Sequence, residues 1–312
     1  MSDTLTLRFL YNTIPGRAIL KVLVTPAVSK AGGVLLSSGF SKLFIDGFIK
    51  KHNIDMSATD IPKEGFPSFN AFFKRKRKSI EYDLSPGRLI SPCEAFLTPA
   101  VIRDGTVLDI KNSRYTVEDL LQDKELAKEF ENGLALIFRL TPANYHRYSF
   151  AVSGFVQKSR RIDGELHCVR PVALRNIPVH ARNSREYVVV ETEDFGKVVQ
   201  MEVGALFVGK IQNHPLVQSG SATASEAASE SASVAASGPA SEAASEAASE
   251  SAAGFPYVKA GDEKGFFEFG GSTIILLLQK DAVDFDETLL SPRDENDEIP
   301  VDIGAFIANT KS

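Results

Sequence analysis

The pattern of hydrophobic and polar positions divides this chain into stretches of different character. Residues 5–53 mix apolar clusters with scattered cations, and part of this stretch carries helical spacing. Residues 88–217 consist of short apolar runs separated by turns, which is typical of strands. We therefore expect an α+β fold, with N-terminal helices over residues 1–80 followed by a mainly antiparallel β domain over residues 81–312.

Two segments carry specific helix signals. In "SKLFIDGFIKKH" the apolar positions recur at helical spacing with lysines at the edges: Leu43, Phe44, Phe48 and Ile49. A basic amphipathic helix of this kind either packs on a core or lies in a membrane interface. Residues 115–130 predict a helix that interrupts the strands, with Thr116 as its N-cap and Asp119 completing a capping box.

Residues 219–254 have no apolar periodicity and follow a loose S-E-A-A repeat. Alanine and glutamate favour a helix, but like charges four residues apart, such as Glu226 and Glu230, disfavour it. We expect a flexible acidic loop. Because strand-like sequence resumes after it, and long surface loops cost little closure entropy, we interpret it as an insertion within one domain.

Composition narrows the class of protein. The 312 residues are 43% hydrophobic and include two cysteines, Cys93 and Cys168, which disfavours a disulfide scaffold and favours a reducing compartment. The start shows no signal-peptide pattern, and no apolar run reaches the roughly 18 residues of a spanning helix. The net charge is −5, but residues 219–254 hold five glutamates and no cation, so the remainder is balanced.

Residues 74–78 form a run of consecutive cations in "AFFKRKRK". Such a run is usually a solvated face, and it can also meet anionic lipid head groups at about 1 kcal/mol per charge. No aromatic residues interleave it in the manner of a nucleic-acid site, so we expect no nucleic-acid partner.

Two interpretations fit "FFEFGGSTIILLLQ", residues 266–279. The apolar run Ile274–Leu278 predicts a strand buried on both faces, and the glycines before it can mark a bulge or a tight bend. Alternatively, the peptide bond between Gly271 and Ser272 is itself a substrate. Gly271 leaves its carbonyl carbon open to approach, and the Ser272 hydroxyl can attack it from the same chain.

Two further islands supply partners for an activated serine. "SPCEAFLTPAVI" places the carboxylate of Glu94 in a turn after a short strand, and "RLTPANYHRYSF" places His146 between two other polar residues. A serine hydroxyl is weak until a base removes its proton, and a third group commonly orients that base.

Together these segments resemble the pyruvoyl-dependent phosphatidylserine decarboxylase family. The similarity runs through "LRFLYNTIPGR", "SFNAFF", "YHRY", "NSREY", "MEVGALFVGKI" and "EKGFFEFGGSTIILLL", and it covers nearly everything except the acidic insertion. "YHR" alone is a weak signal. The order "MEVGA" and "VGKI", followed by "KGFFEFGGST", is a strong one.

The resemblance implies self-cleavage between Gly271 and Ser272, which gives chains 1–271 and 272–312. Ser272, at the start of a central strand, would become a pyruvoyl group, the cofactor for decarboxylating phosphatidylserine to phosphatidylethanolamine and CO₂ through a Schiff base. His146 would lie beside the pyruvoyl group and transfer a proton during decarboxylation. A structural histidine is the alternative at that position. No metal is implied.

The chain departs from the family at two positions. The family pairs its serine with an aspartate in a "P-x-D-G" turn and with a second histidine in "Y-H-R-x-H", where this chain has Glu94 and Ser149. Ser149 cannot act as a general base near neutral pH. Glu94 could instead accept the proton directly. The alternative is an unprocessed, lipid-binding relative without activity, and a decarboxylase of a soluble amino acid is a third reading.

The resemblance also implies partners and a location. The substrate lies in a bilayer, so we expect residues 1–80 to attach the protein peripherally to an anionic membrane surface, on the cytoplasmic side of the cell membrane. The two cleavage products would form a heterodimer, and a dimer of these heterodimers stays open.

Overall fold

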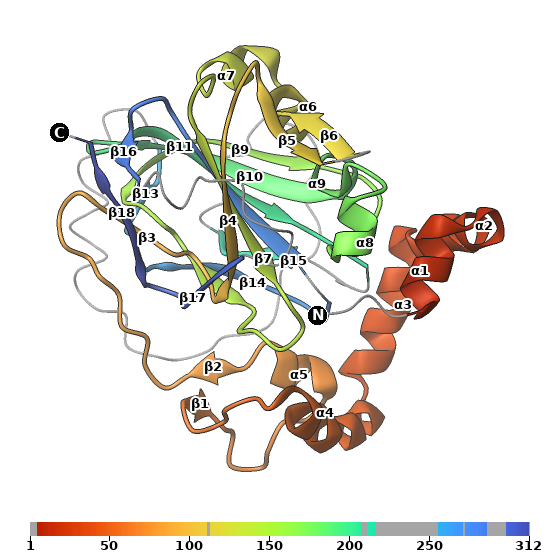
Figure 1. Ribbon diagram of the computed structural model, residues 1–312. Coiled ribbons are helices and arrows are strands. Elements are labelled where there is room, and N and C mark those ends of the chain that lie inside the picture. The colour runs from red at the N-terminus through yellow and green to blue at the C-terminus, as the bar shows by residue number, and fades with distance from the viewer. Residues whose placement is uncertain are drawn as a thin grey trace, which may run out of the picture.

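The computed structural model describes residues 5–110, 113–206, 211–215, 255–270, 272–285 and 298–311. Gly271 and the expected insertion at 219–254 lie outside these residues. N-terminal helices precede a body built of antiparallel sheets, which confirms the predicted α+β class (Figure 1).

The body is organised around an eight-stranded antiparallel sheet of order β13-β9-β10-β11-β15-β7-β4-β17. Its strands are β4 (Ala95–Val101), β7 (Leu134–Leu140), β9 (Gly154–Ile162), β10 (Arg185–Thr192), β11 (Gly196–Val203), β13 (Tyr257–Val258), β15 (Ser272–Leu278) and β17 (Ile299–Val301). β15 pairs with β11 on one side and β7 on the other, so Ser272 begins an interior strand, as predicted.

Four smaller sheets complete the β structure. Two have three strands, β12-β14-β8 and β16-β18-β3, and two are strand pairs, β1-β2 and β5-β6. Their strands are β1 (Thr59–Asp60), β2 (Lys76–Arg77), β3 (Arg88–Ile90), β5 (Thr106–Ile110), β6 (Ser113–Thr116), β8 (Arg147–Ser149), β12 (Ile211–Asn213), β14 (Glu263–Phe267), β16 (Val283–Asp284) and β18 (Phe306–Thr310).

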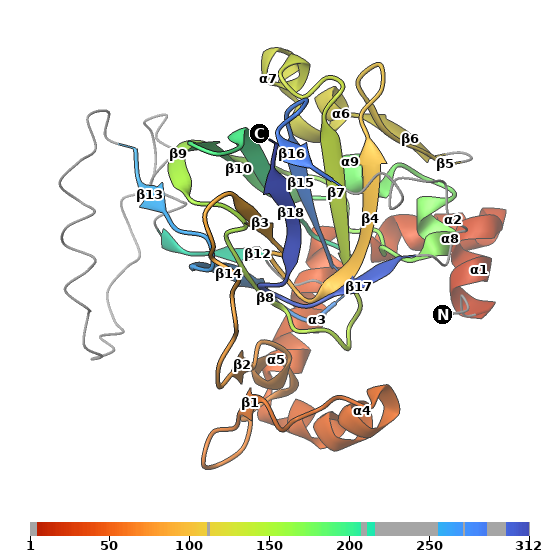
Figure 2. The ribbon, with the colours of Figure 1, turned by 60° about the vertical axis from the view of Figure 1, so that its left-hand side comes forward.

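The helices fall into an N-terminal group and a few short helices on the body. The N-terminal group is α1 (Leu5–Asn12), α2 (Ile14–Leu23), α3 (Pro26–Ser37), the 3₁₀ helix η1 (Gly39–Phe44), α4 (Ile45–His52) and α5 (Phe69–Phe73). The others are α6 (Val117–Leu121), α7 (Lys124–Lys128), α8 (Pro171–Leu174) and α9 (Val179–Arg182). Figure 2 shows α1 and α2 beside α8 at the right of the body, and α4 below the body near α5.

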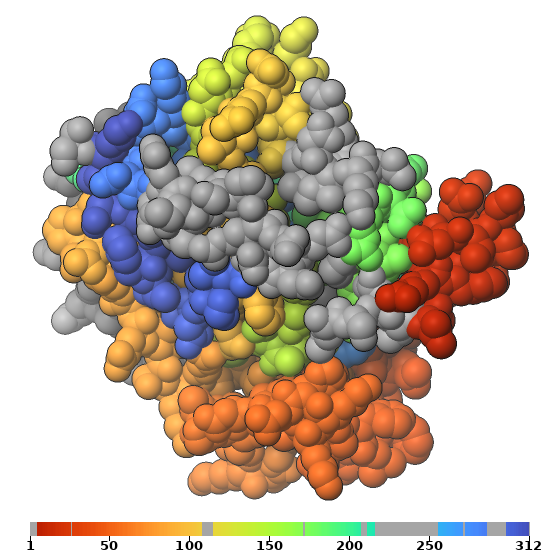
Figure 3. Space-filling view, viewed as in Figure 1, coloured from red at the N-terminus to blue at the C-terminus, as the bar shows by residue number. Residues whose placement is uncertain are grey.

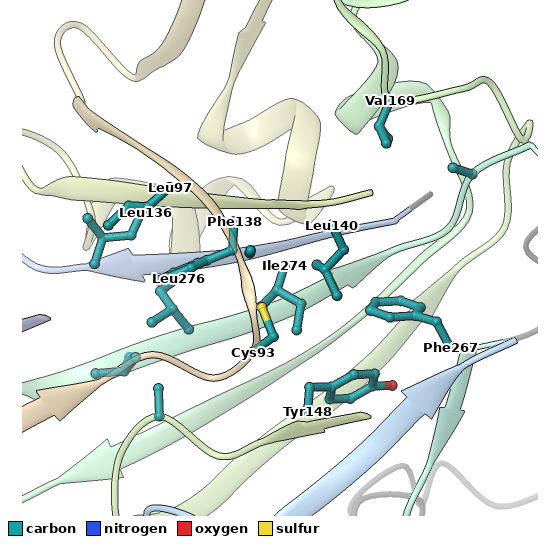
Figure 4. Close-up of a cluster of buried hydrophobic side chains, with 14 of the residues drawn as sticks. Cys93, Leu97, Leu136, Phe138, Leu140, Tyr148, Val169, Phe267, Ile274 and Leu276 are labelled. Atoms are coloured by element: carbon teal, nitrogen blue, oxygen red, sulfur yellow. The ribbon is translucent and has the colours of Figure 1, made fainter. Parts of the chain in front are cut away.

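The apolar run after Ser272 is buried on both faces of the main sheet, as its lack of alternation predicted. Ile274, Leu276 and Leu278 face a core shared with the smaller sheets, which includes Tyr148 on β8 and Phe267 on β14 (Figure 4). The alternate side chains of β15 face a second core beneath α6 and α7. β15 is therefore fixed in register from both sides.

The expected helix at 115–130 is two helices rather than one. The capping box of Thr116 and Asp119 is present and begins α6. Gln122 then adopts a left-handed conformation with φ 48°, and Asp123 caps α7 with its side chain on the backbone N–H of Leu126. Asp123 is therefore the N-cap of a second helix, which begins just after the first helix has ended at Gln122.

The N-terminal helices are anchored to the body at one end. The Tyr11 hydroxyl accepts a hydrogen bond from the Cys168 N–H at 3.1 Å, and the Leu166 N–H donates to the Val24 carbonyl at 2.9 Å. Gly16 lets α2 cross close to α1, because a Cβ there would lie 2.0 Å from the Phe9 carbonyl oxygen. α1 and α2 are thus part of the folded core and not a loose appendage.

The same helices expose many large apolar side chains: Leu5, Phe9, Ile14, Ile19, Val22, Val34, Leu35, Phe40, Leu43 and Phe44. Phe48 and Ile49 instead pack against α5, so the amphipathic segment at residues 41–52 is part exposed and part core. Over the described residues no single helix is long and apolar enough to cross a membrane, whereas the bent pair Ile14–Leu23 and Ala27–Ser37, at 63°, passes by length and composition.

A buried ion pair ties β14 to the main sheet. The Lys264 ammonium donates to the Glu202 carboxylate on β11, and both side chains are fully buried. Lys264 also donates to Asn213 Oδ1 at 3.3 Å, and Gln200 donates to Glu202. Removing one partner of such a pair leaves an uncompensated buried charge. The pair therefore helps to hold β14, which leads directly to the Gly-Ser segment.

Candidate active site

Ser272 is fully buried at the first position of β15, and its hydroxyl has no hydrogen-bond partner among the described residues. Ser272 pairs with Leu140 on β7, and paired residues in an antiparallel sheet point to the same face. Leu140 belongs to the core that includes Tyr148 and Phe267, so the Ser272 side chain faces the small sheet β12-β14-β8. A buried hydroxyl without a partner is costly and calls for an explanation.

The segment before Ser272 has an unusual backbone. Gly270 has φ 146°, a conformation that residues with a side chain rarely adopt, which explains a glycine at this position. The Phe269 N–H donates to Asn70 Oδ1 on α5 at 3.1 Å, and the Phe269 ring contacts Phe73. The chain is therefore held on both sides of the Gly-Ser pair. Gly271 itself lies outside the described residues.

His146 is fully buried beside this segment, and its ring lies against the ring of Phe73 with 3.9 Å between centroids. Its Nδ1 is 2.8 Å from the Asn144 carbonyl oxygen, which can only accept, so Nδ1 carries the proton. Nε2 then presents a free lone pair, and it has no hydrogen-bond partner among the residues described.

The His146 ring is neutral at physiological pH. Burial, and after it the nearby Arg75 guanidinium, lower the pKa of His146 to about 3, although the backbones of Asn144 and Gly270 oppose the shift. Gly270 is thus close enough to favour the protonated ring, although Nε2 makes no hydrogen bond of ordinary geometry. His146 can therefore accept a proton at Nε2, and the protonated ring would then interact favourably with the Gly270 backbone.

Glu94 lies in the turn between β3 and β4, as predicted, and its carboxylate is fully engaged. It accepts hydrogen bonds from Asn144 Nδ2 at 2.8 Å, from the Tyr145 N–H at 3.1 Å and from Arg77 Nη2 at 2.5 Å. The two residues before His146 are therefore fixed by Glu94. The structure assigns it no hydrogen bond to Ser272, whose hydroxyl is unpartnered among the described residues.

Ser149 is buried on β8 and supports the turn that carries Glu94. Its N–H donates to the Pro92 carbonyl at 2.9 Å and its hydroxyl to the same oxygen at 3.4 Å. Its own carbonyl accepts a hydrogen bond from Gln200 Nε2 at 3.0 Å. Ser149 thus connects the turn of Glu94 to the main sheet, and its hydroxyl is not directed at Ser272.

The structure brings the predicted residues into one neighbourhood, but not into a chain of hydrogen bonds. Glu94 and His146 are connected through Asn144, and His146 lies by Gly270, two residues before Ser272. Two extended residues span about 7 Å, so the serine and the histidine are close without being bonded. The roles of these residues stay predictions.

The basic run at residues 74–78 is not the solvated face that its composition favours. Arg75 is buried with 6% of its surface exposed, and Arg77 is engaged with Glu94 and Asp302. Lys76 and Lys78 are exposed. Arg75 is a site residue that sequence reasoning missed. The available signal was the pair Phe72 and Phe73 in "FNAFFKR". Two adjacent large apolar residues predict a buried helix end, and the residues that follow it start close to the core.

Neither the pocket nor the metal-binding residue types point to a different site among the described residues. A pocket of about 590 Å³ lies on the other side of the main sheet, lined by residues such as Tyr115 and Arg182, and holds none of the predicted site residues. In the part of the chain that the structure describes, no three histidine, cysteine, aspartate or glutamate residues gather as a metal site would require.

The fold and these side chains define an α+β protein whose candidate active site lies where an interior strand begins. Comparison with known proteins identifies the family. The sequence model of the phosphatidylserine decarboxylase family matches residues 68–308. The chain therefore belongs to the phosphatidylserine decarboxylase family.

Similar proteins match over nearly the whole chain. A phosphatidylserine decarboxylase proenzyme 2 from Clostridium acetobutylicum is 37% identical over 309 residues, which cover 97% of this chain and 91% of the relative. A phosphatidylserine decarboxylase proenzyme from Ruminiclostridium cellulolyticum is 36% identical, with coverage of 97% and 90%. One from Chlamydia trachomatis is 32% identical, with coverage of 91% and 83%.

Proposed function

We propose that this chain converts phosphatidylserine to phosphatidylethanolamine and CO₂ after cutting itself between Gly271 and Ser272. The observation that carries the proposal is the Ser272 hydroxyl. It is buried with no partner among the described residues, two residues after Gly270 with its unusual backbone conformation. Relatives that span the whole chain are named proenzymes, which supports a maturation step and disfavours an unprocessed lipid-binding protein.

Maturation uses groups of the chain itself. The Ser272 oxygen loses its proton and attacks the Gly271 carbonyl carbon, so the C–N bond breaks and an ester forms. Removal of the Ser272 α-proton then breaks the Cβ–O bond and releases the carboxylate of Gly271. Water replaces the remaining nitrogen, ammonia leaves, and residue 272 becomes a pyruvoyl group.

The surroundings of residue 272 fit a pyruvoyl group. Its side chain is buried on the face of the main sheet that β8 covers, and β8 begins at the residue after His146. A pyruvoyl ketone supplies an electron sink for the bond that breaks when CO₂ leaves. His146 presents an unprotonated Nε2 that can accept a proton and return it to the product. The Phe73 ring packs against the His146 ring, which is fully buried. Glu94 and Ser149 position the loop.

Glu94 has a second proposed role, as proton acceptor from Ser272 during maturation in place of the family's aspartate and histidine. Its full set of hydrogen bonds favours positioning, since Arg77 and Asn144 would have to release the carboxylate first. Maturation is a single turnover, so a slow step that requires such a rearrangement is tolerable.

The function is tested by intact mass under denaturing conditions together with CO₂ release. We expect two chains that break at Gly271–Ser272, with the smaller one blocked at its N-terminus and lighter by one ammonia than an unmodified fragment. Vesicles with carboxyl-labelled phosphatidylserine should release labelled CO₂ only with cut protein. A single uncut chain without CO₂ release would favour the lipid-binding alternative.

The N-terminal helices attach the protein to the membrane that holds its substrate, on its cytoplasmic side. Their exposed apolar side chains gather on α1 to η1, and the same helices carry the exposed cations Lys21, Lys30 and Lys42. Figure 3 shows these helices standing at the margin of the body, where a surface can reach them. An apolar face with basic flanks suits an interface with anionic lipid.

An aromatic cluster connects these helices to the site. Phe48 on α4 contacts Phe69 and Phe72 on α5, and it also contacts Phe269. Phe269 lies three residues before Ser272 and against Phe73. The element that would meet the bilayer is thus packed directly on the segment that precedes the cleavage site, which gives a lipid a short apolar route.

Membrane attachment is tested by substitution, because deleting the helices would also remove core residues such as Tyr11 and Leu20. The double variant Phe40→Ser with Leu43→Ser should bind phosphatidylserine-containing vesicles at least about tenfold more weakly. Burial of one large apolar side chain contributes about 1.5–3 kcal/mol, and about 1.4 kcal/mol is tenfold in affinity. Vesicle sedimentation measures the effect.

The matched control replaces exposed apolar residues of the body, Leu84→Ser with Tyr257→Ser. This variant should bind vesicles as the wild type does. Equal losses in both double variants, or no loss in the first, would contradict attachment through the N-terminal helices.

A further inference from the structure

Arg75 is a buried guanidinium whose hydrogen-bonding capacity is largely unused. Its exposed fraction is 6%, Nη1 has no partner among the described residues, and Nη2 makes one long hydrogen bond of 3.4 Å to the Ala143 carbonyl. The group lies over the Phe72 ring, 5.0 Å from its centroid. A charge removed from water without full compensation is costly, so its retention requires a reason.

The other buried arginine of the described chain shows what structural use looks like. Arg185 donates from Nε to Leu120 and from Nη2 to Asp119, both to backbone carbonyls at 2.7 Å. Its Nη1 donates to two further carbonyls. Every nitrogen of Arg185 is thus satisfied by the fold. Arg75 has no such set, although its environment is equally closed.

Arg75 also has no ion pair of its own in the part of the chain that the structure describes. The charge of Glu94 acts on it, but that carboxylate is bonded to Arg77. Burial lowers the pKa of Arg75, Glu94 opposes this, and Arg77 adds to the lowering. An arginine remains protonated in proteins even so. A cationic group with an unused donor therefore lies in the neighbourhood of His146, and it could bind an anion there.

We propose that Arg75 binds the phosphodiester of the lipid head group and so places the reacting carbon of phosphatidylserine beside His146 and residue 272. The inference rests on the proposed function. In phosphatidylserine one ester oxygen and one methylene separate the phosphorus from that carbon. A phosphate held at Arg75 would thus put the amine and the carboxylate within the small region that His146 and Gly270 already define.

The phosphodiester is a better ligand for Arg75 than the carboxylate, which the same substrate also carries. The carboxylate loses its negative charge as CO₂ forms, so a cation bound to it would stabilise the substrate more than the transition state and slow the reaction. The phosphodiester keeps its charge throughout. Binding there holds substrate, transition state and product alike, and it leaves the carboxylate near the neutral His146 and Phe73.

The test compares binding of two short-chain lipids below their micelle concentrations, dihexanoyl phosphatidylethanolamine and dihexanoyl phosphatidylserine. The two differ in the carboxylate alone. Binding is measured on self-cut protein whose pyruvoyl ketone has been reduced with borohydride, so that neither lipid reacts. There Arg75→Met should weaken both by the same factor of about 10 to 100, the range for loss of a charged hydrogen bond. KM for the serine lipid should rise by a similar factor with kcat little changed.

Two variants frame this result. Lys76→Met removes the same charge one residue away at an exposed position, and it should change either affinity less than about threefold, the scale of a screened surface charge. Arg75→Lys keeps the charge without the planar fork and should fall between wild type and Arg75→Met.

The outcomes separate the inference from the function. Loss of affinity for the serine lipid alone would assign Arg75 to the carboxylate and overturn the proposal, as would unchanged affinity for both lipids in a folded Arg75→Met protein. If wild-type protein is cut and releases CO₂ but Arg75→Met binds both lipids normally, the proposal for Arg75 fails and the proposed function stands. Wild-type protein that stays uncut and inactive would refute the function instead.

A measurement on the wild type covers the case in which neither Arg75 variant folds. In protein with ¹⁵N-labelled arginine, the two buried guanidinium groups should give slowly exchanging side-chain signals. Dihexanoyl phosphatidylethanolamine should shift the signal of Arg75 and leave that of Arg185, whose nitrogens are already bonded, in place. No shift at saturating lipid would overturn the proposal.

Discussion

A Ser272→Ala variant should remain one uncut chain and release no CO₂. Alanine leaves residue 272 without a hydroxyl to attack the Gly271 carbonyl, so we expect cleavage to be lost completely and not merely slowed. The variant should also fold at least as well as the wild type, because it removes a buried hydroxyl that has no partner among the described residues. Intact mass and thermal unfolding measure the two effects.

Thr273 offers a matched control. Its hydroxyl is likewise buried and unpartnered in the described structure, but β15 alternates, so Thr273 faces the opposite side of the sheet with its neighbour Val203. Thr273→Val, which keeps the shape, should therefore cut normally. If Thr273→Val stayed uncut as well, the loss in Ser272→Ala would report on the strand and not on a nucleophile.

The strand that carries Ser272 was predictable because its sequence overdetermines it. An apolar run without alternation must be buried on both faces, and such a run can only occupy the interior of a sheet. The resemblance to the family then indicated that the peptide bond just before this strand, between Gly271 and Ser272, is the cleavage site. The order of the strands in the sheet was not predictable, since pairing between β11, β15 and β7 joins residues far apart in the chain.

Two errors of prediction have a common physical origin. The helix at 115–130 breaks at Gln122 because Asp123 caps a new helix, and the periodic pattern does not register that competition. The basic run at 74–78 was assigned to a surface because charges usually are, yet Arg75 is buried behind Phe72. In both cases tertiary packing decided the outcome, and charge or periodicity alone could not indicate it.

The geometry of the candidate site was also beyond the sequence. Glu94 and Ser149 were identified as departures from the family. Their hydrogen bonds among the described residues support loops, and none of these bonds reaches Ser272. The tautomer of His146 follows from one carbonyl, that of Asn144, two residues earlier. Asn144 gave no sequence signal, because an asparagine before a histidine is compatible with any turn.

His146→Asn should give protein that cuts itself but decarboxylates about a hundred- to ten-thousandfold more slowly, the usual range for loss of a general acid or base. The asparagine amide can still donate to the Asn144 carbonyl as Nδ1 does, so the loop should keep its shape. The base at Nε2 is lost. Intact mass and labelled CO₂ release measure maturation and turnover on the same sample.

Whether a variant loses self-cleavage or decarboxylation depends on which of the two reactions its residue serves. Glu94→Gln should slow maturation, because it removes the charge that holds Arg77 and the proposed acceptor for the serine proton. Cleavage at the normal rate in Glu94→Gln would contradict that role. If His146→Asn stayed uncut, His146 would act in maturation, and its neutral Nε2, which presents a lone pair in the uncut chain, would be the base that activates Ser272.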